Sequence, residues 1–227
     1  MQQENIMKDF HLNRPSSITP SGFFGKSPKN INELENFLTK EENDFLLNFA
    51  KNNTLWDFTE DSYDKDGLIL YQANIWKDRV CTTETLQKAS LNAHEMIAKI
   101  YQRLKPIIES FFEVEVQQTF PAIVRWPVGT RQEPHADKEF HIGKEKGRPN
   151  EFPHFDIATV IYLNDDYEGG QLYFPMQGYE FTPKSGAAYF FPGDRFYVHG
   201  VRPVISGTRY TSPLFWTIKK HTGEKQP

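Results

Sequence analysis

Apolar residues recur every three or four positions in two stretches of the first half of the chain. The first follows Thr39, whose hydroxyl is placed to accept a hydrogen bond from the Glu42 amide in a capping box, and it predicts a helix over 40–52. The second predicts a longer helix over 83–105, which Pro106 is expected to end or kink because its ring clashes with the preceding turn. Apolar Ile107, Ile108 and Phe111 indicate another helical turn or two beyond Pro106.

After residue 112 the pattern changes to short apolar runs separated by turns rich in Gly and Pro. Many short strands of this kind are typical of a sandwich or barrel, so the expected fold is mainly β with helices (α+β), the helices covering one sheet. The expected strands are Val114–Gln117, Ala122–Trp126, Ile157–Leu163, Gln171–Phe174, Ala187–Phe191, Phe196–His199 and Arg209–Ile218. The expected organisation is an arm over 1–30, a single domain over 31–220 (helical support 31–112, β core 113–220) and a tail over 221–227.

Composition narrows the class of protein. A formal net charge of −4 argues against a nucleic-acid partner. No apolar run approaches the roughly 20 residues of a membrane helix, and the first residues carry no basic and apolar leader pattern. The single Cys81 excludes an internal disulfide and a thiolate zinc cluster. We therefore expect a cytoplasmic protein without a membrane partner, and its oligomeric state stays open.

Two short His-x-Asp patterns are candidate metal sites. His135-Ala136-Asp137 precedes a charged loop over 138–150, whereas His154-Phe155-Asp156 leads directly into an apolar strand. Residues i and i+2 of a strand point the same way, so each pair offers an imidazole and a carboxylate side by side. With a distant second His, such a pair makes the ligand set of non-haem Fe(II) oxygenases. Its position at a strand end favours the first pair; His154 and Asp156 remain the alternative.

The candidates for the second His and for a carboxylate-binding residue lie near the end of the chain. His199 lies in a predicted strand beside Gly200, and its alternative interpretation is a half-buried His bonded to a carbonyl. Arg209 follows a turn at Ser206-Gly207 that would fold it back beside His199. Its planar guanidinium suits a bidentate carboxylate, and the alternative is an exposed Arg on an edge strand.

Motifs in a fixed order link these residues. They are Pro134-His135-Ala136-Asp137, the segment Ile157–Pro175 with Glu168-Gly169-Gly170, Pro183-Lys184-Ser185-Gly186, Phe190-Phe191-Pro192, His199-Gly200-Val201-Arg202-Pro203-Val204 and Gly207-Thr208-Arg209-Tyr210. The series covers about 120–218 and resembles the 2-oxoglutarate- and Fe(II)-dependent oxygenases, within them the prolyl 4-hydroxylase-like branch. In that family the metal pair precedes the strand that corresponds to 157–163, so the resemblance selects His135 and Asp137.

The resemblance implies a double-stranded β-helix, or jelly roll, with N-terminal helices packed on one sheet. It implies that His135, Asp137 and His199 bind iron and that Arg209 binds the distal carboxylate of 2-oxoglutarate. Tyr162 falls at a cosubstrate-contacting position, and Trp126 stands where a cosubstrate-binding Tyr is typical. The implied cofactors are Fe(II), 2-oxoglutarate as cosubstrate, O2, and ascorbate as reductant.

The implied function is hydroxylation of a C–H bond, foremost on a prolyl residue in a peptide or protein. One alternative keeps the chemistry and changes the substrate to a free amino acid, another side chain or a nucleobase; another is a non-catalytic jelly-roll binding module. The loop 138–150 borders the expected iron site, and we hypothesise that it folds over the substrate; the alternative is a solvated loop. Its candidate contact residues are Lys138, His141, Lys144, Lys146 and Arg148.

Overall fold

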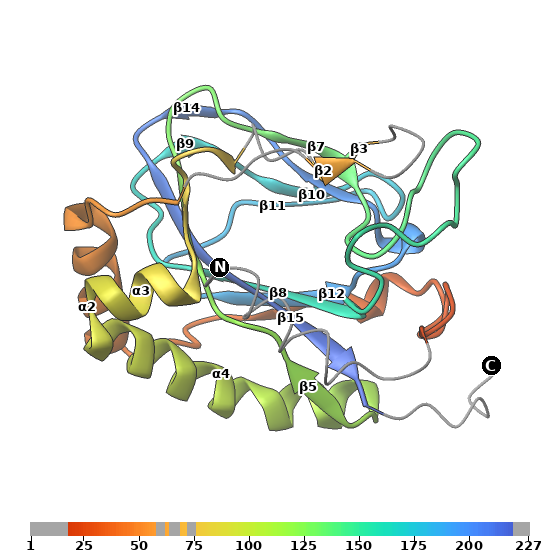
Figure 1. Ribbon diagram of the computed structural model, residues 1–227, viewed down its shortest axis with the longest axis horizontal. Coiled ribbons are helices and arrows are strands. Elements are labelled where there is room, and N and C mark those ends of the chain that lie inside the picture. Colours follow the sequence, from red (N-terminus) through yellow and green to blue (C-terminus); the bar gives the residue numbers. More distant parts are fainter. Residues whose placement is uncertain (1–17, 58–61, 64–68, 72–75, 220–227) are drawn as a thin grey trace.

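Two antiparallel sheets face each other, and the long helices gather on the side of the larger sheet that faces away from the smaller one (Figure 1). The computed structural model describes residues 18–57, 62–63, 69–71 and 76–219. The arrangement confirms the expected mainly β jelly roll with helices on one sheet. Most of the expected arm and the whole expected tail lie outside the described residues.

The larger sheet has the strand order β1-β12-β8-β15-β6-β4, and β5 also pairs with β15. Its side chains alternate between two apolar layers: Ile161 and Leu214 pack toward the helices, whereas Tyr162 packs in the layer between the sheets. The strands are β1 Asn32–Leu34, β4 Val80–Cys81, β5 Val116–Gln118, β6 Ile123–Trp126, β8 Ile157–Tyr162, β12 Ala188–Pro192 and β15 Arg209–Ile218.

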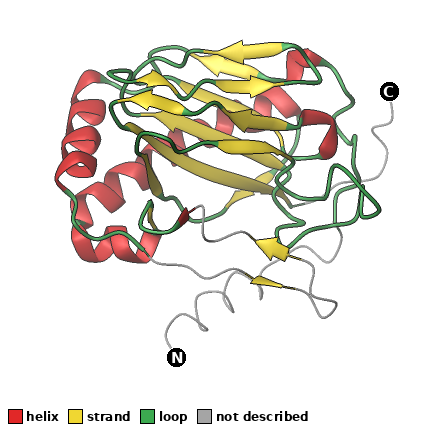
Figure 2. Ribbon diagram, turned by 90° about the horizontal axis from the view of Figure 1, so that it is seen from above, coloured by secondary structure: helices red, strands yellow, loops and turns green. Residues whose placement is uncertain are grey.

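The smaller sheet has the order β11-β10-β13-β7 and lies above the larger one in Figure 1. Figure 2 shows the layered strands from above. Because β7 pairs with β13, residues 64 positions apart in the chain become neighbours at one sheet edge. The strands are β7 Gln132–His135, β10 Leu172–Phe174, β11 Tyr179–Phe181 and β13 His199–Val201; β9 Glu168–Gly169 pairs with β14 Val204–Ser206, and β2 Ser62–Tyr63 with β3 Ile69–Tyr71.

Helix α2 spans Lys40–Asn52, as predicted, and its capping box is complete. The Thr39 hydroxyl accepts from the Glu42 amide at 3.2 Å, and the Glu42 carboxylate accepts from the Thr39 amide at 3.0 Å. These two bonds satisfy backbone donors that the first turn leaves without helical partners.

The single helix expected over 83–105 is wrong at one point, and the turns expected beyond Pro106 are present. The segment forms α3 (Thr83–Ala89) and α4 (Leu91–Phe112), separated by Ser90 in an extended conformation. The Ser90 hydroxyl accepts from the Ala93 amide at 3.2 Å and so starts the second helix. Pro106 does not end α4, because the buried side chains beyond it continue to pack on the core. None of the helices in the described part of the chain is long and apolar enough to cross a membrane.

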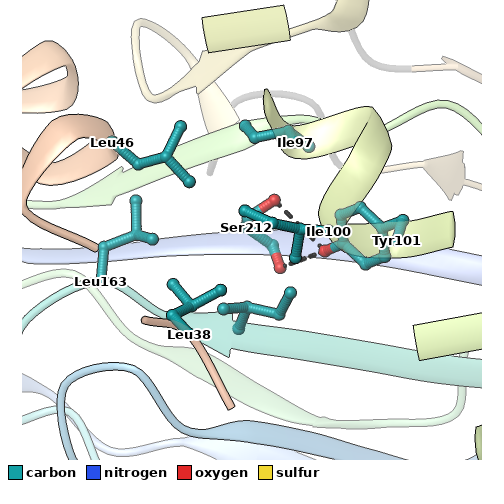
Figure 3. A pocket seen from close by; sticks show the side chains of 8 residues that line it. Leu38, Leu46, Ile97, Ile100, Tyr101, Leu163 and Ser212 are labelled. Carbon is teal, nitrogen blue, oxygen red and sulfur yellow. Dashed lines mark hydrogen bonds between the residues drawn. The ribbon is translucent and has the colours of Figure 1, made fainter. Parts of the chain in front are cut away.

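A small apolar pocket, too small for a water molecule, lies within the core between the helices and the larger sheet (Figure 3). The fully buried Tyr101 of α4 donates its hydroxyl to the Ser212 carbonyl of β15 at 2.7 Å. This hydrogen bond ties α4 to the central strand and satisfies the only polar group of the Tyr101 side chain. This pocket is part of the packing that carries β15, and it lies apart from the polar residues described below.

Two further segments differ from the sequence expectation. The strand expected over Phe196–His199 is mostly a 3-10 turn, η3 (Arg195–Tyr197), because the Asp194 carboxylate accepts from the Phe196 amide at 2.9 Å. Only His199 of that expected strand lies in β13. Residues 18–30, which include η1 (Pro28–Asn30), pack on the body: the Phe24 ring lies 4.5 Å from the Phe112 ring.

Candidate functional site

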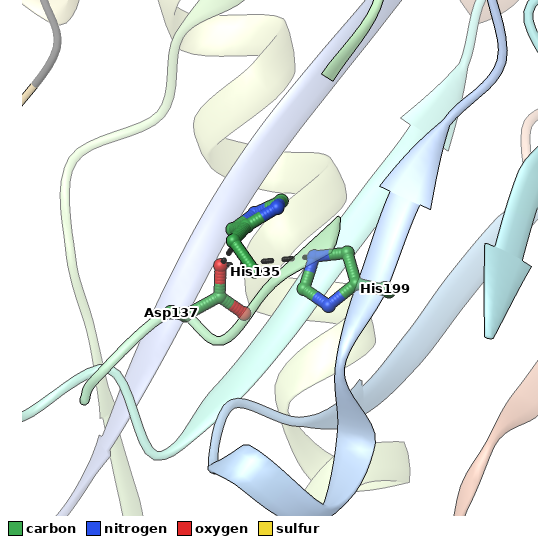
Figure 4. Close-up of side chains that lie close together, drawn as sticks. All are labelled: His135, Asp137 and His199. Carbon is green, nitrogen blue, oxygen red and sulfur yellow. Dashed lines mark ion pairs between the residues drawn. The ribbon is translucent and has the colours of Figure 1, made fainter. Parts of the chain in front are cut away.

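Three potential metal ligands meet at one edge of the smaller sheet. His135 ends β7, His199 begins β13, and the two are direct partners in the strand register, with ring centroids 4.3 Å apart. Asp137 follows β7 by two residues and points toward both rings (Figure 4). One ligand atom from each residue lies within 4.8 Å of the other two. The structure thus brings together the three residues that the sequence analysis selected.

Hydrogen bonds orient both imidazoles. The Nδ1 atom of His135 bonds to the Glu133 carbonyl at 2.9 Å, and that of His199 to the Tyr197 carbonyl at 3.1 Å. A carbonyl accepts only, so each Nδ1 carries the proton and each Nε2 keeps its lone pair. The two Nε2 atoms lie 3.6 and 3.8 Å from Oδ1 of Asp137. Peripheral bonds of this kind are what metal-binding histidines use to fix their tautomer.

Burial sets the charge state of this cluster. Burial lowers the pKa of His199 to about 4, with Asp137 opposing the shift and His135 adding to it. The imidazole is therefore neutral at pH 7 and offers a lone pair. Oδ2 of Asp137 is buried and has no hydrogen-bond partner among the described residues. A buried carboxylate with one unbonded oxygen, beside two imidazoles whose Nε2 atoms face it, fits a divalent cation of the non-haem iron type.

The backbone around Asp137 is fixed from two sides. Its amide donates to the Gly193 carbonyl at 2.9 Å, and its carbonyl accepts from the Asn150 side chain at 2.9 Å. A Cβ added to Gly193 would lie 2.1 Å from the Phe155 carbonyl oxygen and 3.2 Å from Cβ of Asp137. Glycine at 193 is therefore what lets two chain segments close around the carboxylate.

The second His-x-Asp pattern is structural. Asp156 accepts from the Lys138 ammonium and from the Ile218 amide at 2.9 Å, and both ionised side chains are almost completely buried. The His154 carbonyl accepts from the Thr217 hydroxyl at 2.8 Å. Lys138 was expected among the substrate-loop residues, and this expectation is wrong: its ammonium points inward to Asp156 because a buried carboxylate needs a cation there.

Arg209 is buried in strand β15 of the larger sheet. It is the register partner of Trp126 across β15 and β6, and its Nη2 donates to the Tyr162 hydroxyl at 2.8 Å. The guanidinium carbon also lies 4.6 Å from the centroid of the Trp126 ring. The structure therefore brings Arg209, Tyr162 and Trp126 together. Arg209 is only 1% exposed, yet its Nε and Nη1 have no partner among the described residues. Two unpaired, buried donors of one guanidinium fit a carboxylate.

Sequence reasoning missed several neighbours of these two clusters. Thr211 accepts from the Trp126 indole N–H at 3.1 Å, and its position two residues after Arg209 in the strand was the available signal. Tyr167 lies beside Arg209, and its hydroxyl is buried without a hydrogen-bond partner among the described residues. The side-chain amide nitrogen of Gln132 lies 3.0 Å from Nε2 of His135, and no sequence motif indicates this contact.

The loop after Asp137 is folded on itself. Phe140 donates to the Arg148 carbonyl at 3.0 Å, and Gly147 donates back to the Phe140 carbonyl at 2.8 Å. His141 is partly buried, and its pKa is lowered by burial first and then by the charges of His135 and Lys146. Of the other candidate contact residues, Lys144 and Lys146 are exposed, and Arg148 pairs with Glu145 at 2.8 Å.

A family model described as the 2OG-Fe(II) oxygenase superfamily matches residues 122–217, which carry both clusters. Over this segment the chain is similar to that superfamily. Prolyl 3-hydroxylase 1 of Gallus gallus is 24% identical over 158 residues, which are 61% of this chain and 22% of that protein. The chain thus spans about a fifth of the length of the curated relative.

Solved structures share the fold. The viral collagen prolyl hydroxylase vCPH of Paramecium bursaria Chlorella virus-1 matches with a TM-score of 0.57 and 18% identity, over 90% of this chain and 96% of that one. A prolyl hydroxylase from Trichoplax adhaerens, solved with a hypoxia inducible factor peptide fragment, matches with a TM-score of 0.55 and 15% identity, over 88% and 89% of the two chains. At these identities the likeness shows the jelly-roll fold.

Proposed function

We propose that this chain is a 2-oxoglutarate- and Fe(II)-dependent dioxygenase that hydroxylates a prolyl residue in a peptide or protein. The observation that carries the proposal is the cluster of His135, Asp137 and His199, whose ligand atoms lie within 4.8 Å of one another. We propose these three residues as the iron ligands. Two imidazoles and one carboxylate on one side of a metal leave positions free for other ligands.

When bound, Fe(II) with 2-oxoglutarate and O2 supplies an oxidising centre that converts a C–H bond to C–OH and releases succinate and CO2. The protein's part is to hold and orient. The carbonyl bonds to Nδ1 keep Nε2 of both histidines aimed at Asp137. The closure of the chain around Gly193 keeps that carboxylate from turning away.

We propose that Arg209 binds the distal carboxylate of 2-oxoglutarate. Its unpaired Nη1 would donate to one carboxylate oxygen and the second N–H of Nη2 to the other, while the first N–H of Nη2 stays on the Tyr162 hydroxyl. Since the guanidinium is buried, a carboxylate there meets a weakly screened charge, which favours a diacid over a monoacid. Trp126 supplies a flat apolar wall and donates its only N–H to Thr211, so it leaves no donor of its own for the ligand.

Several finer assignments belong to the same proposal. The prolyl substrate is supported by the names of the relatives, which are prolyl hydroxylases. We propose that His141, Lys144, Lys146 and Arg148 face the substrate, since the loop begins directly after Asp137. Ascorbate is the proposed reductant. A reducing compartment, the cytoplasm, agrees with Cys81, whose thiol is buried and has its pKa raised to about 12.

The test is succinate release from 2-oxoglutarate with Fe(II) and ascorbate, for wild type, His135→Ala and His154→Ala. We expect turnover in wild type and His154→Ala and its loss in His135→Ala, with thermal unfolding as the check that both variants fold. Proline-containing peptides then report hydroxylation as a mass gain of one oxygen atom. Wild-type protein that binds neither iron nor 2-oxoglutarate would contradict the proposal.

A further inference from the structure

A stack of arginine and tryptophan side chains leads from Arg209 to the edge of the larger sheet. The Trp126 ring lies between two guanidinium groups, with the Arg209 carbon at 4.6 Å and the Arg79 carbon at 4.2 Å from its centroid. Arg79 also lies 5.0 Å from the Trp76 ring, and Trp76 meets Trp126 edge to face at 5.3 Å. The order of the stack is Trp76, Arg79, Trp126, Arg209.

The backbone fixes Arg79 in this place. Arg79 directly precedes β4, whose Val80 pairs with Val124 of β6. The Arg125 amide donates to the Arg79 carbonyl at 2.9 Å, and the Arg79 Nε donates to the Arg125 carbonyl at 3.2 Å. The side chain is 7% exposed. Arg79 is thus a buried cation on the far face of the ring that lines the proposed cosubstrate pocket.

The guanidinium groups of Arg79 and Arg209 repel each other, and their attraction to the Trp126 indole offsets this repulsion. A guanidinium is attracted to the negative face of an aromatic ring, and the attraction grows when both groups leave water. Each face of Trp126 carries one guanidinium, and the indole N–H is held by Thr211 at 3.1 Å. The ring therefore cannot tilt without losing contacts on both faces. Its position sets where the guanidinium of Arg209 lies.

We propose that Arg79 is a positioning residue for the dicarboxylate cosubstrate: it holds Trp126 flat against Arg209, so that the free donors of Arg209 meet the distal carboxylate. This inference rests on the proposed function. In this proposal Trp126 also couples two residues: the position of Arg79 affects the position of Arg209 through the ring that lies against both guanidinium groups.

The variant Arg79→Met keeps the length of the side-chain stem and removes the charged plane. We expect it to weaken 2-oxoglutarate binding about 5- to 30-fold, the range that corresponds to one desolvated cation–π contact. The turnover number at saturating cosubstrate should stay within about twofold, because Arg79 touches neither the metal ligands nor the reacting carbon. Arg79→Lys, which keeps the charge and loses the plane, should recover part of the affinity.

Arg125→Met is the matched control. Its guanidinium also stacks on a tryptophan, 4.4 Å from the Trp56 ring, and donates to the Asp78 carbonyl at 2.8 Å. It is the chain neighbour of Trp126 in β6, so strand alternation turns its side chain to the opposite face of the sheet from Trp126. We expect this variant to bind 2-oxoglutarate like wild type.

The experiment is calorimetric binding of 2-oxoglutarate and of 2-oxobutyrate, which lacks the distal carboxylate, in the presence of Mn(II), together with kinetics. The expected result is a weaker Kd and a higher KM for 2-oxoglutarate in Arg79→Met, with 2-oxobutyrate binding unchanged. If wild type binds 2-oxoglutarate and Arg79→Met binds it equally well, the inference is overturned and the proposed function stands. Equal losses for both acids also overturn it, because they indicate a general loss of structure. No binding by wild type overturns the proposed function and the inference together.

Discussion

The buried ion pair of Lys138 and Asp156 leads to a quantitative prediction. The side chains of Lys138 and Asp156 are 4% and 2% exposed, and Lys138 directly follows Asp137 in the chain. Lys138→Met keeps most of the volume of the Lys138 side chain and removes its ammonium. Among the described residues, the Asp156 carboxylate then keeps the Ile218 amide as its only hydrogen-bond partner. Removing one member of a buried pair costs about 3–5 kcal/mol of unfolding free energy, because the remaining charge stays desolvated.

The size of the chain converts this cost into a melting shift. For a domain of about 200 residues, 1 kcal/mol moves Tm by roughly 2–4 °C, so Lys138→Met should lower Tm by roughly 6–20 °C. The double variant Lys138→Met/Asp156→Asn removes both charges and keeps an acceptor for Ile218, so it should recover most of the loss.

The assay is urea unfolding of wild type, both single variants and the double variant, followed by tryptophan fluorescence. The half-exposed pair of Lys105 and Glu109, 2.8 Å apart, supplies a control: Lys105→Met should cost under about 1 kcal/mol. A cost below about 1 kcal/mol for Lys138→Met would refute the reasoning, since water would then have to reach the pair.

Three further changes test other parts of the structure. Gly193→Ala should weaken Mn(II) binding at least tenfold in a calorimetric titration, because its Cβ would press on Asp137; unchanged affinity would contradict the close approach. Glu42→Gln should cost about 1 kcal/mol at pH 7 in urea unfolding, since Arg103 lowers the pKa of Glu42, and the difference should vanish as the pH falls below about 4.5. In metal-free protein, the unfolded chain takes up a proton at His199 near pH 6.5, whereas the folded site does so only near pH 4. Stability should therefore fall between these pH values, and His199→Gln should show a smaller slope.

Local sequence pattern was enough for the residues of the site that lie next to each other in the chain. His135 and Asp137 are two residues apart at a strand end, where alternation turns both side chains the same way. Their choice over His154 and Asp156 needed the order of motifs along the chain. The contact of His135 with His199 depends on the register of β7 and β13, and no local pattern in either strand states that register.

The errors have two physical sources: a local side-chain cap, and contacts between residues far apart in the chain. The apolar period runs unbroken from 83 to 105, and the break at Ser90 follows from a side-chain cap that competes with the helix. Lys138 looks like one charge among several in an exposed loop, and only the position of Asp156 draws it inward. Arg79 lies outside every motif, and its stacking on Trp126 follows from the pairing of β4 with β6.

The two halves of the proposed active site stand on different sheets. The metal cluster is carried by β7 and β13 of the smaller sheet, and Arg209 by β15 of the larger one. Their separation is therefore set by the side chains packed between the sheets, not by either strand register. Phe191 of the larger sheet lies 4.6 Å from the His199 ring, and Phe174 of the smaller sheet lies 5.7 Å from it. A ligand held at one end by a metal and at the other by an arginine needs a constant distance between the two. A misplacement of about 1 Å can lower the reaction rate by about 100-fold. Phe174 and Phe191 are rigid rings of this kind, and they hold His199 in place relative to the sheet that carries Arg209.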